Sequence, residues 1–516
     1  MARLKQPAAR LPPPPAPKRT AAAASFGSPL RWAIVLSVLL LGLRLRLAES
    51  VGFGDAEALY AAYALHPQPA YLDHPGFIGV VARFIGDGGA PAPLSAHRFT
   101  AFVATALPFV GFLAARAAGA TGTSAYLTFF AVALLPEMSI GLFGLTPDLP
   151  LAVFWLASLG CAAGALRSEP GSRRALVGTV LAGLLAGLAA YSKVTGFLLA
   201  ASLLVAGAGR GARAHLRTVA PYCGAVAGGI VVTPFILWEI RHGYPLLKHR
   251  FVTTQADAGL SLRNAGALIG GQLLYVTPPF LWQAYCVLRD LWRERAEPVA
   301  RLLFLACVIP GVPLVALCLW SRVAEPHWLG PAYLSLAVAL PLASRPSKAV
   351  ARACVAIGVV VPLLGYALVA TPLLPKLMGD KYRPRYDLVN DLYAWQSGLP
   401  LVRAEVEAVQ SQGYVPYVVG PHWTVCAQLH AGLGPDVAVG CRTKGGDDFA
   451  EWYPPSTWSK APVILYVSDD RFPAPPATEF PHRDVARIQT TRIYRGGHVA
   501  RTIRVARLEL QASASR

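Results

Sequence analysis

The feature that most constrains this chain is a series of apolar segments, each close to the length of a membrane-spanning helix. A spanning helix needs about 20 consecutive apolar residues. Hydrophobic residues make up 54% of the chain and charged residues 15%, too apolar a balance for a soluble protein of this length. The sequence predicts a polytopic α-helical membrane protein with about eleven spans, in a range of roughly 9–13. The segments lie at 32–48, 97–116, 122–143, 147–166, 175–191, 194–209, 218–238, 264–288, 300–320, 329–344 and 349–371.

The charges of the loops between these segments predict their orientation. Short basic loops, such as 167–174 and 210–217, alternate with loops that hold most of the acids, such as 49–96. Because basic loops tend to stay in the cytoplasm, the N-terminus is predicted inside and the C-terminal part outside. The loop 239–263 breaks the pattern, since it places Arg241, Lys248 and Arg250 outside. This exception indicates either an external anion-binding surface or an error in the predicted topology.

The chain divides into three parts. Residues 1–31 are basic and rich in Pro and Ala, which predicts a disordered cytoplasmic tail, and residues 32–371 form the membrane domain. Residues 372–516 are soluble in composition, with a helical stretch at 386–412. They also contain strand-like runs at 414–420, 462–469 and 499–510, so we expect a small extracytoplasmic α/β domain.

Cysteine and charge content narrow the function classes. Cys426 and Cys441 lie in the predicted external domain, where they could form a disulfide or remain two unpaired thiols. The formal net charge of +19 resides in short loops between apolar segments, with no basic patch interleaved with aromatic residues. Basic residues in short loops are typical of membrane proteins, where they set the orientation of the spans. They do not form a nucleic-acid-binding surface, so nucleic acid is excluded as a partner.

The first external loop, 49–96, concentrates acids beside the bilayer. Asp55 and Glu57 follow the first span closely, and Asp73 and His74 come later in the same loop. Acids beside lipid are useful to an enzyme that removes a proton from a hydroxyl, so we interpret this segment as the catalytic loop. The alternatives are local: Asp55 and Glu57 could cap a helix near Ala58, and Asp73 and His74 could form a turn.

Several further motifs stand at the ends of spans, in a fixed order. They read DAEALYAAYAL, YLDHPGF, TPDLPLAVFW (146–155), GLLAGLAAYSKVTGFLLA (183–200), TPFILWEIRHGYPLLKHRF (233–251) and EPHWLGPAYLSLAVAL (325–340). Over about residues 30–345 the series resembles the GT-C superfamily of membrane glycosyltransferases. It is most similar to the bacterial, family 39-like proteins related to protein O-mannosyltransferases and to lipid A aminoarabinose transferases. That family has an adjacent Asp-Glu pair in the first loop, whereas here Asp55 and Glu57 are separated by Ala56.

The resemblance implies a function at the outer face of a bacterial inner membrane. A sugar would move from a polyprenyl-phosphate carrier to a lipid, glycan or protein of the cell envelope. Asp55 would be the base, with Glu57 as the second choice. The absence of a P-loop, a Rossmann glycine signature and an Asp-X-Asp motif fits a lipid-borne donor.

Such a reaction needs cations for the departing phosphate. Candidate substrate-binding residues at predicted external span ends are Asp73, His74, Asp148, Lys193, Arg241, His242, His327 and Trp328, with Lys248 and His249 as further cations. Each has a structural alternative: Asp148 could start a helix, Lys193 could reach the membrane interface, and Trp328 could belong to the aromatic belt. The Asp55-Ala56-Glu57 pattern could also bind a divalent metal ion, although no complete ligand set is present.

Two other classes of protein share part of this pattern. A secondary transporter or lipid flippase also has many spans, but it often shows internal repeats and charges deep within them, which are not visible here. An envelope scaffold would use residues 372–516 as its binding module. The sequence favours the glycosyltransferase.

Overall fold

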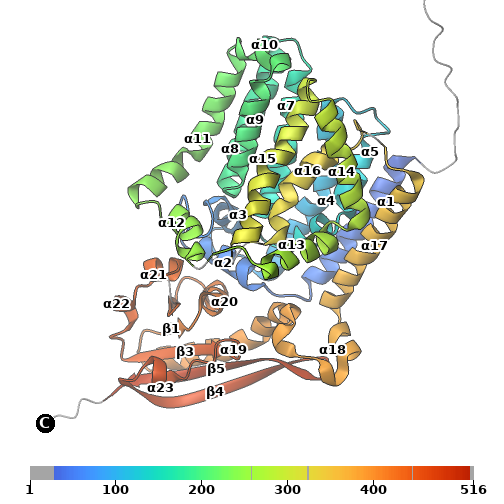
Figure 1. Ribbon diagram of the computed structural model, residues 1–516. Helices are drawn as coiled ribbons and strands as arrows, with labels where there is room; N and C mark the ends of the chain where they lie inside the picture. Colours follow the sequence, from blue (N-terminus) through green and yellow to red (C-terminus); the bar gives the residue numbers. More distant parts are fainter. Residues whose placement is uncertain (1–27, 257, 322–324, 344, 444–445, 512–516) are drawn as a thin grey trace, which may run out of the picture.

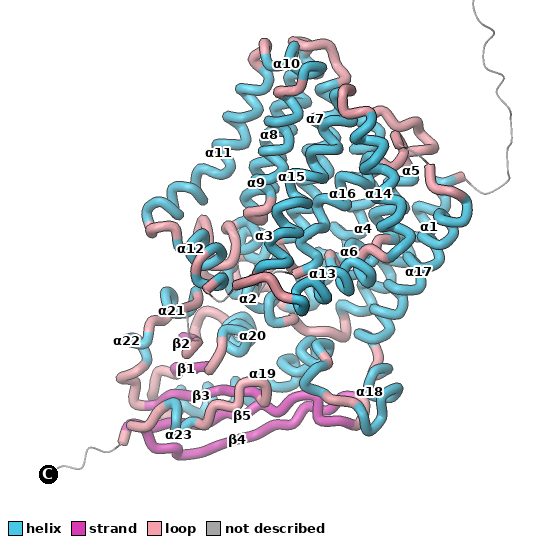
Figure 2. The backbone as a smooth tube through the Cα atoms, in the orientation of Figure 1, coloured by secondary structure: helices cyan, strands magenta, loops and turns pink. Residues whose placement is uncertain are grey.

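The computed structural model describes residues 28–256, 258–321, 325–343, 345–443 and 446–511. Nearly all of the predicted tail, residues 1–27, lies outside these ranges. The described chain forms a bundle of helices with a small sheet domain packed against one end, as Figures 1 and 2 show. Short helices of the first loop lie between these two parts.

The bundle is built from helices of very different lengths. Its long helices are α1 (Pro29–Ala48), α4 (Pro93–Ala118), α7 (Asp148–Leu166), α8 (Arg173–Ser192), α11 (Ala220–Arg241), α15 (Pro298–Trp320) and α17 (Lys348–Ala370). Its shorter helices are α5 (Tyr126–Leu134), α6 (Pro136–Gly141), α9 (Gly196–Gly207), α10 (Arg213–Leu216), α13 (Leu262–Tyr275), α14 (Pro278–Arg293) and α16 (Gly330–Ala339), the last preceded by the 3-10 helix η3 (Pro326–Leu329). The first loop forms α2 (Asp55–Tyr63) and α3 (Phe77–Ile85), and α12 (Pro245–Phe251) follows α11.

Within the described ranges, six helices are long and apolar enough to cross a membrane, or seven if the bent pair α9 and α10 forms one span. They are α4, α7, α8, α11, α15 and α17, and each coincides with a predicted apolar segment. The protein is therefore a multi-pass membrane protein, while the count of about eleven spans stays a prediction.

Two predicted spans are broken rather than continuous. The segment 122–143 divides at Leu135 into α5 and α6, because Pro136 cannot continue the hydrogen bonding of the first helix. The segment 264–288 divides at Val276 and Thr277, where two prolines begin α14 and Thr277 adopts a left-handed φ of 71°. Proline does not lower the apolar character of a run, so these breaks were missed by the predicted span boundaries.

Helices α8 and α11 are in direct backbone contact. Gly183 and Gly187 of α8 face Gly224 and Gly228 of α11, and a Cβ atom on Gly187 would lie 2.7 Å from the carbonyl oxygen of Gly228. Small residues let membrane helices approach this closely and gain dispersion energy. We call this contact the glycine seam. It holds α11 against the bundle although much of α11 is exposed.

The C-terminal domain confirms the predicted small sheet domain. Its strands are β1 (Tyr417–Gly420), β2 (Ala438–Cys441), β3 (Val463–Asp469), β4 (Arg483–Arg495) and β5 (His498–Leu510), and its helices are α18 (Leu373–Met378), α19 (Asp391–Ser411), α20 (Trp423–Leu433), α21 (Asp448–Trp452), α22 (Pro455–Trp458) and α23 (Pro476–Glu479). The sheet order is β2-β1-β3-β5-β4, with β1 parallel to β2 and β3 and the other pairs antiparallel. Cys426 and Cys441 form a disulfide between α20 and β2.

Candidate functional site

Glu57 of the first loop is fully engaged in holding that loop together. Its Oε2 accepts a hydrogen bond from the backbone N–H of Gly54 at 2.9 Å, which closes a capping box at the start of α2. Its Oε1 accepts from the Leu145 N–H at 2.8 Å and is 2.9 Å from His97 Nε2. Burial raises the pKa of Glu57, but His97 and the two amides outweigh it and hold that pKa below its usual value. The predicted capping role of Glu57 is thus present in the structure.

Asp55 joins the first loop to the C-terminal domain. Its Oδ2 lies 2.6 Å from Arg471 Nη1, and its Oδ1 accepts from Gln428 at 3.3 Å. Arg471 also pairs with Asp391 at 3.1 Å and with Asp469 at 2.7 Å. The Asp55 side chain keeps 18% of its surface exposed, so a small hydroxyl group can still reach its carboxylate.

The pair of acids does not fit a metal site. Asp55 faces Arg471, whereas Glu57 is occupied by His97 and two backbone amides. Throughout the described part of the chain, no group of three or more His, Cys, Asp or Glu side chains is arranged to hold a metal ion. Both residues proposed as metal ligands therefore have other partners.

The structure brings two of the predicted binding residues together as a buried ion pair. Lys193, the C-cap residue that directly follows α8, donates from Nζ to Asp148 Oδ1 at 2.7 Å. Asp148 is the first residue of α7, so its carboxylate also sits at the positive end of a helix dipole. The Lys193 ammonium lies 5.9 Å from the ring centre of Trp328, within reach of a cation–π contact.

A second ion pair lies between the first loop and α12. Asp73 is 3.1 Å from Arg250 Nη2 and 3.6 Å from His249 Nε2. Arg250 also donates from Nε and Nη2 to the carbonyl oxygen of Asp73, at 3.1 and 3.0 Å. The basic loop 239–263 thus supplies a cation to the acidic first loop, through Arg250.

Arg241 and His242 stand apart from these pairs. Arg241 is exposed at the end of α11. The His242 ring stacks on Trp238, and its Nδ1 lies 2.8 Å from the Trp238 carbonyl oxygen. The cation of this loop that pairs with the first loop is therefore Arg250, not Arg241. The sequence showed that the loop 239–263 is basic, but it did not show which of its basic residues faces the first loop.

Tyr60 and His74 connect the two ion pairs. Their ring centres are 5.5 Å apart. Burial lowers the pKa of His74 well below its usual value, and the positive charges of Arg250 and Lys193 lower it further. Burial and the carboxylate of Asp73 raise the pKa of Tyr60, and Asp148 adds to this. His74 is therefore neutral and Tyr60 keeps its proton at ordinary pH. Together with the two ion pairs they form what we call the polar cluster.

Beside the polar cluster lies a cavity of about 460 Å³ inside the helical bundle, which we call the site cavity. This volume is in the range of small-molecule binding sites. Its polar lining consists of Glu137, Thr146, Asp148, Tyr275 and His327, and its apolar lining includes Ile140, Leu142, Leu151, Leu274, Leu334, Val361, Leu364 and Leu368. Sequence reasoning missed Tyr60, Glu137 and Tyr275 as site residues. Glu137 had a visible signal, because it is an acid inside a predicted span.

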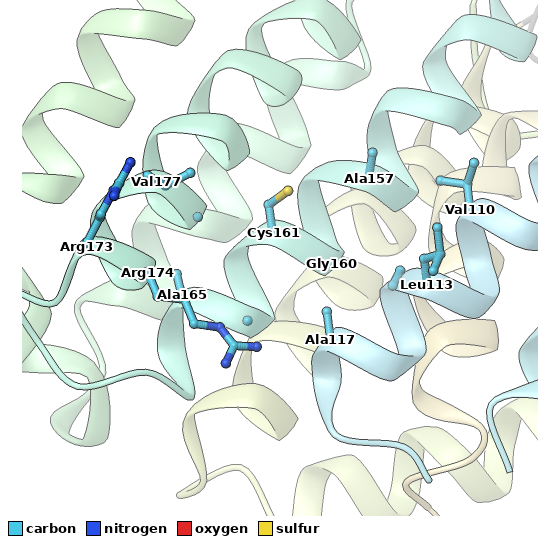
Figure 3. Close-up of a pocket in the computed structure, with 13 residues that line it drawn as sticks. Val110, Leu113, Ala117, Ala157, Gly160, Cys161, Ala165, Arg173, Arg174 and Val177 are labelled. Carbon is cyan, nitrogen blue, oxygen red and sulfur yellow. The ribbon is translucent and has the colours of Figure 1, made fainter. Parts of the chain in front are cut away.

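A larger groove of about 810 Å³ lies at the other end of α7. Figure 3 shows Arg173 and Arg174 of α8 on one side of it and Val110 and Leu113 of α4 on the other. Its remaining lining is Ala114, Ala117, Ala157, Gly160, Cys161, Gly164, Ala165, Val177 and Gly178. The lining contains no acid and no histidine, so this groove offers no group for proton transfer.

The contact between the C-terminal domain and the first loop contains two facing histidines. The Nε2 atoms of His66 and His430 are 2.8 Å apart, and His66 stacks on Trp452 with ring centres 4.2 Å apart. Nearby, Asp448 accepts hydrogen bonds from the Tyr63 hydroxyl at 3.1 Å and from the Leu72 N–H at 2.9 Å. These interactions hold the end of α2 and the following turn against α20 and α21.

We expect this contact to weaken as the pH falls from about 6.5 to about 4. Burial lowers the pKa of His66 to about 4 and that of His430 to about 3, from an ordinary value of 6.5. Their stabilising contribution is therefore present above pH 6.5 and is lost as they gain protons. Burial raises the pKa of Asp448 to about 7, so its contribution changes in the opposite direction, being lost as the pH rises from 3.8 to 7. Two histidines against one acid leave a net loss on acidification.

Hydrogen exchange of residues 60–75, corrected for intrinsic rates, measures this contact across the pH range. The variant His430→Gln should flatten the profile, because it leaves one histidine, His66, opposed by one acid, Asp448. A contact that becomes tighter between pH 6.5 and 4 would contradict the assignment.

Residues 93–238 match the family model described as dolichyl-phosphate-mannose-protein mannosyltransferase. No curated protein is similar enough in sequence to count as a match. The structure of ArnT from Cupriavidus metallidurans bound to undecaprenyl phosphate is similar over 92% of this chain and 97% of that chain, with a TM-score of 0.58 and 16% identity. The apo structure of the same ArnT gives a TM-score of 0.58, 15% identity and coverage of 92% and 98%.

At this level of identity the likeness to ArnT establishes the fold. The family match adds a relationship in sequence over α4 to α11, and both agree with the resemblance seen in the motifs. The chain therefore has the fold of ArnT and, over residues 93–238, is similar in sequence to the family described as dolichyl-phosphate-mannose-protein mannosyltransferase.

Proposed function

We propose that the protein transfers a sugar from a polyprenyl-phosphate carrier to a cell-envelope acceptor, on the membrane face where the C-terminal domain lies. The observation that carries the proposal is the buried Lys193–Asp148 pair at the lining of the site cavity. A cation beside an apolar cavity inside a membrane bundle suits a ligand with a phosphate and a hydrocarbon chain. The match to an ArnT structure that holds undecaprenyl phosphate supports the same class of ligand.

The residues of the polar cluster would act on the phosphate. Lys193 uses one of its three N–H donors on Asp148 and has two left for a phosphate oxygen. Arg250, whose positive charge also acts on His74 and Tyr60, would neutralise further charge as the sugar–phosphate bond breaks. The leaving group is the polyprenyl phosphate, which keeps the electron pair of the broken bond.

The acceptor would be activated from the side of the C-terminal domain. We assign Asp55 as the base that takes the proton of the acceptor hydroxyl, whose oxygen then forms the new bond to the sugar carbon. Its partial exposure supports this role, and its ion pair with Arg471 would orient the carboxylate. Glu57 supports the position of α2 through its capping box and its contact with His97. Activation by a positioned carboxylate contributes about 10²–10⁴ in rate.

The test is transfer by the purified full-length protein in proteoliposomes. The probes are undecaprenyl-phosphate-linked pentoses and hexoses carrying a radiolabelled sugar, added to envelope extract from a strain that lacks the protein. We expect at least one donor to give a labelled product that depends on the protein. Failure of every donor, with movement of the lipid between leaflets, would instead favour the lipid flippase.

A further inference from the structure

Glu137 is an acid inside the helical bundle that the proposed reaction does not use. It is the second residue of α6, directly after the break at Leu135, and its surface is only 9% exposed. It lines the site cavity together with Asp148 and Tyr275. A carboxyl group in such a position is costly unless it has a partner, so its retention requires an explanation.

The described part of the protein supplies no hydrogen-bond partner to one oxygen of this carboxyl group. Glu137 Oε2 is buried and accepts from no donor in it. The nearest strong charges are those of Asp148, which repels a carboxylate, and Lys193, whose ammonium is 2.7 Å from Asp148. A residue of the cavity lining therefore carries a buried acceptor atom that has no partner among the described residues.

The neighbouring helix is shaped to leave room for this group. Gly330, the first residue of α16, also lines the site cavity. A Cβ atom on Gly330 would collide with Glu137 Oε1 and would lie 3.2 Å from the Met138 side chain. Any larger residue at position 330 would have to displace the carboxyl group. Glycine at position 330 thus leaves the space that the Glu137 carboxyl group occupies.

The chemistry of the proposed donor decides which part of it can meet Glu137. The prenyl chain has no hydrogen-bond donor, and the phosphodiester that joins it to the sugar carries only acceptor oxygens at neutral pH. Only the sugar carries groups that donate a hydrogen bond to a carboxylate. We propose that Glu137 is a specificity residue that accepts a hydrogen bond from a hydroxyl or ammonium group of the donor sugar. This inference rests on the proposed function and goes beyond it by placing the sugar in the site cavity.

The test compares the binding of two probes to the full-length protein in nanodiscs. One probe is undecaprenyl phosphate without a sugar, and the other is the undecaprenyl-phosphate sugar that the wild type binds most tightly in the donor panel. Glu137→Leu should weaken binding of the glycosylated probe by about ten- to a hundred-fold, the range for a lost hydrogen bond to a charged group. Binding of undecaprenyl phosphate should stay within about two-fold of wild type, since one hydrogen bond is the only contact removed.

Two further variants separate this role from a structural one. Gly330→Ala keeps the carboxylate but displaces it, so it should weaken binding of the same probe selectively. Glu169→Leu makes the same chemical change on an exposed loop and should alter neither affinity. Equal weakening of both probes in Glu137→Leu, or no weakening of the glycosylated one, would overturn the inference and leave the proposed function standing. A wild-type protein that binds no glycosylated probe would overturn both.

Discussion

Replacing Asp55 by Asn is expected to lower the rate of sugar transfer by about 10²–10⁴-fold, the contribution typical of a positioned general base. Asparagine has nearly the same shape as aspartate but cannot take a proton from the acceptor hydroxyl. The measurement is the initial rate of transfer in proteoliposomes, at saturating donor. The Cys426–Cys441 disulfide and membrane insertion of the variant should not change, because Asp55 lies at the start of α2 and contacts the C-terminal domain through Arg471.

Arg471→Gln is the matched control for this variant. It removes the cation from the same ion pair and leaves the Asp55 carboxylate in place. We expect a smaller loss of rate, together with faster hydrogen exchange in α2, because Arg471 also holds Asp391 and Asp469. Equal losses of rate in both variants would show that Asp55 acts only by holding the domain contact. An unchanged rate in Asp55→Asn would remove it from the mechanism.

Replacing Lys193 by Met is expected to destabilise the protein by about 3–5 kcal/mol, since it leaves the partly buried Asp148 carboxylate without its cation. The same change should abolish binding of undecaprenyl phosphate, because it removes the ammonium that pairs with Asp148 of the cavity lining. Thermal unfolding in detergent measures the first effect, and equilibrium binding measures the second.

The double variant Lys193→Met with Asp148→Asn separates the two roles of the lysine. It removes both charges, so most of the lost stability should return while phosphate binding stays absent. If the double variant binds undecaprenyl phosphate as tightly as the wild type, Lys193 has only a structural role. If Lys193→Met unfolds at the wild-type temperature, the ion pair does not contribute to stability.

Hydropathy was sufficient to predict the continuous spans of this fold. Helices α4, α7, α8, α11, α15 and α17 each contain one uninterrupted apolar run, and length and composition alone identify such runs. The breaks at Leu135 and at Thr277 were not visible in the same way, because they arise from backbone geometry near proline rather than from polarity.

In the C-terminal domain, the inner strands were predicted from the sequence and the edge strands were not. The three inner strands, β1, β3 and β5, contain apolar runs and were expected from the sequence. The two edge strands were missed: β2 has only four residues, and β4 is exposed along most of its length and includes several charged residues. Edge strands are commonly short or charged, so their sequences resemble those of loops.

The candidate site was predicted as individual residues but not as pairs. Asp148 and Lys193 were both expected to bind substrate, yet nothing in the sequence indicated that residues 45 positions apart form one ion pair. Arg250 and Asp73, 177 positions apart, are a similar case. Such pairings depend on the packing of α7, α8 and α12, which a single sequence does not specify.

The glycine seam has a consequence for the two cations of the polar cluster. Lys193 directly follows α8 as its C-cap residue, and Arg250 lies on α12, the helix that follows α11. Because α8 and α11 touch along Gly183, Gly187, Gly224 and Gly228, the separation of the two positive charges is set by how closely these backbones approach. Replacing one of these glycines by alanine would therefore change the distance between the Lys193 and Arg250 charges at the membrane surface. That distance determines the size of the anion that the two cations can bind together.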